Sequence, residues 1–284
     1  MKIISNDIKK RISAWLNIIR VGNSVALGIA SVVGYVLGNG VNVLSAIKLF
    51  FIAFSIGGGG NVINDYCDRY VDSINKPWRP IPLGLIKPRE ALIASLALFT
   101  SGILLAFSHS IICGLIALAA TILVFLYSYS LKKVFLVGNI VIAFLTALAI
   151  IYGATFSQLT VHVALASLYA FLFNLGREFL KGIEDVEGDK AFGIATIAVL
   201  YGSRTAFHTS VCIFTILIVL SVMPIITLSY GIAYTILALF VNFIIIVSLL
   251  RARTLKASDA LKATRMLKAA VFAGLFAFLL HSSF

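Results

Sequence analysis

Nine long apolar segments restrict the folds open to this chain more than any other feature of its sequence. A helix needs about 20 residues to cross the hydrocarbon core of a bilayer, and each segment is close to that length. Backbone groups in lipid must be satisfied within the segment, and no segment shows the alternating pattern of a barrel strand. The predicted fold is therefore all-α, a transmembrane bundle of about nine helices. The segments cover residues 23–39, 43–63, 91–108, 110–130, 134–156, 160–180, 205–229, 231–250 and 266–282.

The composition supports one integral membrane domain over residues 1–284. Hydrophobic residues make up 61% of the chain and charged residues only 12%, whereas about a quarter of a soluble domain is charged. The net charge of +12 does not indicate a nucleic acid partner, because the basic residues flank apolar segments instead of forming one patch. Such positions favour contact with anionic membrane lipid. No feature of the sequence indicates a protein partner.

Residues 1–22 do not resemble a cleavable signal peptide, because no short apolar core with a small-residue cleavage site follows the basic residues. Instead, apolar residues recur at helical spacing with basic residues between them. This pattern predicts an amphipathic helix that lies in the membrane interface and leads into the first span. Its apolar positions are Ile8, Ile12, Trp15, Leu16 and Ile19.

The charged residues gather on one side of the predicted bundle. With the N-terminus in the cytoplasm, nine spans place all of the 23 basic residues except Lys48 in inner segments, in agreement with the positive-inside rule. All 11 acidic residues fall on the same side. We therefore expect a multi-pass protein of the cell membrane, with its N-terminus and its active site at the cytoplasmic face.

Most of the acidic residues form two clusters, each at the end of an apolar segment. In the first cluster, Asn64, Asp68 and Asp72 are four residues apart and share one face of a helix, with Asp65 beside them. The second cluster runs from Glu178 to Asp189 and contains Arg and Lys. Crowded carboxylates repel one another and need cations. Oxygen ligands without His or Cys suit Mg²⁺ or Ca²⁺, so the two clusters predict a site for Mg²⁺ and diphosphate.

Both clusters resemble signatures of the UbiA superfamily of intramembrane prenyltransferases. Residues Asn64–Gly84 (NDYCDRYVDSINKPWRPIPLG) are similar to its first motif, and Arg177–Thr196 (REFLKGIEDVEGDKAFGIAT) are similar to its second. Residues 129–133 (YSLKK) resemble a shorter tyrosine–lysine element. The nine-span layout matches over essentially the whole chain. The amino-acid sequences of both motifs look most like those of the archaeal digeranylgeranylglyceryl phosphate synthases. One departure is Gly182, where many relatives carry a further Asp.

The resemblance implies Mg²⁺-dependent transfer of a geranylgeranyl group from geranylgeranyl diphosphate to the hydroxyl of a lipid-like acceptor, geranylgeranylglyceryl phosphate, in archaeal ether-lipid synthesis. It implies a cap over the site, formed in part by a Pro-rich turn around Arg79. The implied metal ligands are Asn64, Asp68, Asp72, Asp185 and Asp189. The implied catalytic residues are Asp65, Asp68, Asp72, Asp185 and Asp189. The implied substrate-binding residues are Asn61, Asn64, Arg79, Tyr129, Lys133, Arg177 and Lys181. Aromatic candidates for stabilising an allylic cation are Phe125, Tyr127, Phe171 and Phe173.

Three alternatives remain open at this level. An aromatic quinone precursor or a tetrapyrrole could replace the lipid acceptor, because the motifs concern only the diphosphate. A transporter could use the run Gly57–Gly60 as a helix break, although no acid lies at the membrane midplane. A structural membrane protein would leave both acidic clusters unexplained.

Overall fold

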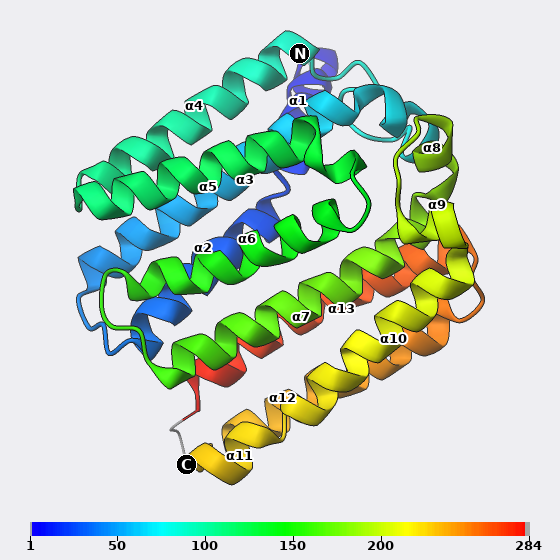
Figure 1. Cartoon of the computed structure of the whole chain (residues 1–284). Coiled ribbons are helices and arrows are strands. Elements are labelled where there is room, and N and C mark those ends of the chain that lie inside the picture. Colours follow the sequence, from blue (N-terminus) through cyan, green and yellow to red (C-terminus); the bar gives the residue numbers. More distant parts are fainter. Residues whose placement is uncertain (1, 282–284) are drawn as a thin grey trace.

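The computed structural model describes residues 2–281, with side chains from residue 8 onward, and all regular structure in this part of the chain is helical. The predicted all-α fold is therefore confirmed (Figure 1). The elements are α1 (Lys2–Ile19), α2 (Val21–Leu37), α3 (Val43–Asn75), α4 (Pro88–Phe107), α5 (Ile111–Tyr129), the 3₁₀ helix η1 (Leu131–Lys133), α6 (Val137–Ala154), α7 (Val161–Glu184), α8 (Val186–Ala191), α9 (Ile197–Tyr201), α10 (Ser203–Leu220), α11 (Met223–Leu228), α12 (Ile232–Ala252) and α13 (Ala257–Leu279).

Seven stretches of helix are long and apolar enough to cross a membrane, and they lie in α3 to α7, in α10 with α11, and in α12. An eighth span is added if α1 and α2, which are bent by 44° at their junction, are counted as one. The described part of every predicted segment lies mainly within a long helix. The last segment overlaps α13, which is not among the seven, and its residue 282 lies outside the described residues. The count of nine spans therefore stays a prediction.

The junction between α1 and α2 is formed by Arg20, whose backbone has the left-handed φ of 50°. In α1, Ala14 and Ile18 are buried in a cluster that includes Val62 of α3. Of the predicted apolar positions, Ile8, Ile12 and Leu16 are more than half exposed, whereas Trp15 and Ile19 pack against this cluster. An exposed apolar stripe of this kind suits the predicted position in the membrane interface.

Small residues allow the spans to approach closely. A Cβ at Gly34 of α2 would lie 1.8 Å from the carbonyl oxygen of Ile150, and one at Gly153 of α6 would lie 1.9 Å from that of Ser31. The backbones of α2 and α6 therefore touch, as is common between membrane helices. The run Gly57–Gly60 also lies against neighbouring helices, and α3 continues through it without a break. This continuity removes the main support for a broken transporter helix.

The length of α3 determines where the first motif lies. Its 33 residues span about 50 Å, well beyond the hydrocarbon core of about 30 Å. The helical part of the motif, Asn64–Asn75, occupies the last three turns of α3. The turn after α3, η1, α8 and α9 gather at this same end of the bundle (Figure 1). Both acidic motifs are thereby placed at the same end of the bundle.

Candidate active site

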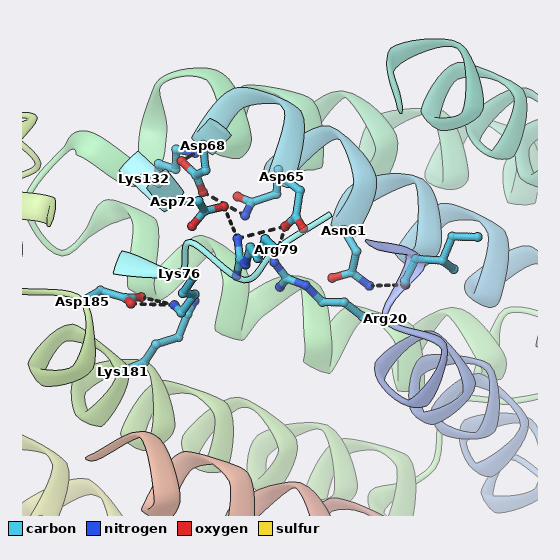
Figure 2. A network of polar contacts seen from close by, with 12 residues as sticks. Arg20, Asn61, Asp65, Asp68, Asp72, Lys76, Arg79, Lys132, Lys181 and Asp185 are labelled. Carbon is cyan, nitrogen blue, oxygen red and sulfur yellow. Dashed lines mark hydrogen bonds and ion pairs between the residues drawn. The ribbon is translucent and has the colours of Figure 1, made fainter. Parts of the chain in front are cut away.

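The first motif is held by two arginines from outside α3. Asp65 and Asp72 are both buried. Arg79, in the Pro-rich turn after α3, forms ion pairs with both carboxylates, at 3.0 Å from Asp65. Arg20 contacts Asp65 from the α1–α2 junction at 2.5 Å. Figure 2 shows Arg79 between the two carboxylates. The neighbouring acids would repel each other without these cations, so both charges are held in place before any ligand binds.

The third acid of this motif pairs with η1. Asn64 donates a hydrogen bond to Asp68 at 3.0 Å, as expected for side chains one turn apart on the same helix face. Lys132 forms an ion pair with the other oxygen of Asp68 (Figure 2). Because α5 ends at Tyr129 and a 3₁₀ turn follows, Lys132 points to the site, whereas Lys133 is exposed. Tyr129 is 67% exposed and stacks on Phe125.

The second motif lies at the turn between α7 and α8. Asp185 follows the last residue of α7. Its carboxylate is 2.5 Å from the ammonium of Lys76, which also lies 3.1 Å from Glu184. The side chain of Asn75 donates to the carbonyl oxygen of Asp185 at 3.0 Å and accepts from the backbone N–H of Gly188 at 2.8 Å. The end of the first motif therefore holds the turn of the second.

The two motifs line a single polar cavity of about 90 Å³. Asp189 forms no ion pair within residues 8–281, and burial together with the neighbouring Asp185 raises the pKa of its carboxyl to about 7. An unpaired carboxyl in this position is suited to bind a cation that enters the cavity together with a ligand. The charged and amide side chains of the cavity are Asn64, Asp68, Asp72, Asn75, Lys76, Arg79, Lys132, Asn139, Glu178, Lys181, Asp185 and Asp189.

A second, larger cavity of about 750 Å³ adjoins the polar one and shares Asn64, Tyr127, Glu178 and Lys181 with it. It follows one face of α7 from Ala166 to Lys181, a length of about 22 Å. Most of its lining is apolar, and this combination of an elongated apolar space with a charged end suits a ligand that has a long hydrocarbon tail and an anionic head.

The donor set of the polar cavity fits Mg²⁺ that arrives with phosphate. Its lining offers carboxylate and amide oxygens and no His or Cys, and Oδ1 of Asn64 is buried with no hydrogen-bond partner. No three His, Cys, Asp or Glu side chains among the described residues are placed to hold a metal ion by themselves. Mg²⁺ commonly takes one or two carboxylates and completes its shell with waters and phosphate oxygens, so the carboxylate and amide oxygens of the lining suit it.

Some of the predicted site residues line the polar cavity, some line the larger cavity, and others line neither. The five proposed metal ligands, Arg79 and Lys181 all line the polar cavity. Arg177 and Asn61 line the larger cavity, where Asn61 donates to the carbonyl oxygen of Ile19 at 3.1 Å. Tyr127 and Phe173 also line it, whereas Phe125 and Phe171 do not.

Three of the predicted site residues lie outside both cavities. Tyr129 and Lys133 line neither cavity, because the helix end and the 3₁₀ turn direct them away. Asp65 lines neither cavity either, because Arg20 and Arg79 hold its buried carboxylate. The charged and amide residues of the two cavities that were not among the predicted site residues include Arg20, Asn75, Lys76, Lys132, Asn139, Glu178 and Lys268. Asn75 and Lys76 lie inside the recognised first motif, and Lys132 is next to the predicted lysine, so their only signal was proximity to a motif.

A polar site at the end of an apolar cavity, in a bundle that can cross a membrane, defines an integral membrane enzyme for substrates with anionic heads and hydrocarbon tails. The model of the UbiA prenyltransferase family matches residues 26–278, and the chain belongs to this family. It is accordingly a prenyltransferase with several membrane spans.

Known relatives agree with this assignment. The digeranylgeranylglyceryl phosphate synthase of Hyperthermus butylicus is 39% identical, over 93% of this chain and 95% of that protein. A solved structure of a digeranylgeranylglyceryl phosphate synthase has a TM-score of 0.71 and 30% identity, covering 96% of this chain and 98% of that one. A UbiA homologue from Archaeoglobus fulgidus, solved with DMAPP and Mg²⁺, has a TM-score of 0.66 at 17% identity and covers 92% and 99% of the two chains. At 17% identity, this last similarity supports a shared fold alone.

Proposed function

We propose that this chain transfers a geranylgeranyl group from geranylgeranyl diphosphate to the free hydroxyl of geranylgeranylglyceryl phosphate. The observation that carries the proposal is the junction of the two cavities, where a charged site made by both motifs opens onto a long apolar space. The relatives with high coverage are digeranylgeranylglyceryl phosphate synthases, which favours this acceptor over an aromatic ring or a tetrapyrrole.

In this proposal the diphosphate lies in the polar cavity. Mg²⁺ bound with the diphosphate supplies positive charge to the leaving group, and the residues that would hold it are Asn64, Asp68, Asp72, Asp185 and Asp189. Lys76, Arg79 and Lys132 now pair with carboxylates at the site. On substrate binding they share their charge with the phosphate oxygens, where preorganised cations stabilise the charge that develops. Lys181 lines both cavities and therefore lies beside the bond that breaks.

The larger cavity protects the reacting carbon. Departure of the diphosphate leaves an allylic cation, which water would capture, so the apolar lining serves to exclude water. The ring faces of Tyr127 and Phe173 line this space and can stabilise the cation. The acceptor hydroxyl attacks the cation and loses its proton to the departing diphosphate. Asp65 acts as a positioning residue for Arg20 and Arg79, since its carboxylate does not reach either cavity.

A product assay on detergent-purified protein tests the proposal. Geranylgeranyl diphosphate, geranylgeranylglyceryl phosphate and Mg²⁺ should give a doubly prenylated glyceryl phosphate, and EDTA or either Asp68→Ala or Asp185→Ala should abolish it while the protein stays folded. Activity retained in both variants would refute the metal assignment. Diphosphate consumption with no such product would keep a prenyltransferase and remove this acceptor.

We also propose that the N-terminus and the active site face the cytoplasm, because the basic residues concentrate at that end. Single cysteines introduced into a cysteine-free background at Arg253 and at His109 would report on opposite ends of the bundle. A membrane-impermeant thiol reagent applied to intact cells should label the His109 position and not the Arg253 position. The reverse pattern would invert the orientation.

A further inference from the structure

A separate pair of cations faces the larger cavity. Arg177 on α7 and Lys268 on α13 line the cavity of about 750 Å³, and neither lines the polar cavity. The two helices run antiparallel, because Thr264 donates to Glu184 at 3.0 Å at one end while the ring of Phe278 packs on Tyr169 further along. Lys268 follows Thr264 by one turn and so approaches the level of Arg177.

Arg177 is poorly satisfied by the residues around it. Its Nε is buried with no hydrogen-bond partner. One of its terminal nitrogens lies 3.4 Å from Oδ1 of Asn174 and 4.0 Å from Glu178, both long contacts. Glu178 is closer to Lys181, at 3.1 Å. A buried donor without an acceptor is costly, so this guanidinium has capacity for a further anion.

Lys268 likewise has no acidic partner within residues 8–281. Its strongest charged neighbours are Arg177 and Arg20, both of which repel it, and the acid that attracts it is Glu184. Glu184 is already bonded to Lys76 and to Thr264. Arg177 is partly buried and Lys268 is exposed, and both line the larger cavity. Like charges that share one cavity repel each other, and an anion between them would offset this repulsion. The two cations therefore offer a binding position for an anion at the charged end of the larger cavity.

The proposed reaction needs such a site. Its acceptor carries a phosphate on the same three-carbon glycerol as the reacting hydroxyl, so this phosphate must lie within a few bonds of the carbon that leaves the diphosphate. Two phosphate-bearing groups then lie close together and repel each other. Cations dedicated to the acceptor, outside the polar cavity but beside it, would offset this repulsion.

We infer that Arg177 and Lys268 bind the phosphate monoester of the lipid acceptor, while the residues of the polar cavity bind the donor diphosphate. The inference rests on the proposed function. It assigns acceptor specificity to two residues that come from different helices and lie outside the turn between α7 and α8.

Thermal stability in detergent tests the assignment without turnover. Geranylgeranylglyceryl phosphate should raise the Tm of the wild-type protein and of Lys268→Arg, and should have little effect on Lys268→Met. Geranylgeranyl diphosphate with Mg²⁺ should stabilise all three equally, which shows that they are folded. Lys262→Met is the matched control, since Lys262, like Lys268, is exposed on α13 but lines neither cavity.

Steady-state kinetics gives the second readout. In Lys268→Met the KM for the acceptor should rise about 10- to 100-fold, the range for loss of a charged hydrogen bond, with the KM for the donor unchanged. An equal rise in both KM values would assign the cations to the diphosphate and overturn the inference. Full stabilisation of Lys268→Met by the acceptor would also overturn it. Stabilisation of the wild type by the donor but not by the acceptor would instead contradict the proposed acceptor.

Discussion

The side-chain amide of Asn75 accepts a hydrogen bond of 2.8 Å from the backbone N–H of Gly188. This contact joins the last residue of α3 to the short helix α8 and links two motifs that are more than 100 residues apart in sequence. A methyl group at position 188 would lie 2.4 Å from the amide nitrogen of Asn75. Glycine is therefore needed at this position for the approach of the two motifs, although its backbone is an ordinary helical one.

Gly188→Ala should separate the two motifs. Moving Asn75 away breaks its bonds to the α7–α8 turn, and loss of buried hydrogen bonds costs about 1–3 kcal/mol. We expect a lower Tm in detergent and a large loss of kcat/KM. Gly274→Ala is the control for stability only, because a Cβ there meets nothing within 4 Å but the residue lines the larger cavity. A Tm equal to that of Gly274→Ala together with wild-type kcat/KM in Gly188→Ala would show that the Asn75–Gly188 contact does not hold the site.

Lys132→Met and Lys133→Met test which of the two lysines contributes to the site. The structure favours Lys132, whereas the sequence predicted Lys133. Lys132 pairs with Asp68 and lines the polar cavity, while its neighbour is exposed. Removal of one preorganised group that stabilises developing charge lowers kcat about 10²- to 10³-fold. We expect a loss of this order for Lys132→Met and a change of less than about threefold for Lys133→Met, measured with saturating Mg²⁺. A larger loss of kcat in Lys133→Met than in Lys132→Met would support the sequence-based prediction that Lys133 binds substrate.

There is a physical reason why the sequence predicted the polar residues of α3 correctly but not the role of Lys132. Spacing placed Asn64, Asp68 and Asp72 on one face because a continuous helix fixes the direction of every side chain. At Lys132 the chain passes from an α-helix through a 3₁₀ turn, and one residue of altered geometry reverses which lysine points inward. Hydropathy likewise predicted the spans but not their packing, so the position of Lys268 and Arg177 on the same cavity could not be read from the sequence. Arg20 forms its ion pair with Asp65 from a left-handed backbone conformation, and no sequence pattern near Arg20 predicts this conformation.

The stability of the metal-free protein should depend on pH through Asp189. Its pKa is raised from 3.8 to about 7 by burial and by Asp185, so between these values the folded state binds the proton more tightly than the unfolded state. This contribution is fully present below about pH 4 and is lost as the pH rises through about 7. Each pKa unit corresponds to about 1.4 kcal/mol. In EDTA, the Tm of the wild type should therefore fall between pH 5.5 and 8 relative to Asp189→Asn.

Parallel Tm curves for the wild type and Asp189→Asn over this pH range would contradict the raised pKa. Mg²⁺ with diphosphate should reduce the difference between the two proteins at pH 8 if Asp189 contributes to binding the cation, since the ionised form is then stabilised. The same variant should be inactive in the product assay.

Gly182 offers a gain-of-function test of the metal site. It lines the polar cavity, and a Cβ at this position would meet only the methyl of Ala198, at 3.8 Å. Because there is room for a side chain here, Gly182→Asp should fold and add a carboxylate to the cavity. We expect the Mg²⁺ concentration for half-maximal activity to fall, because an added carboxylate attracts the cation. Gly182→Asn is the control of equal size without the charge, and it should change helix stability to a similar degree. If both variants shift the Mg²⁺ requirement equally, side-chain volume and not charge at position 182 governs the site.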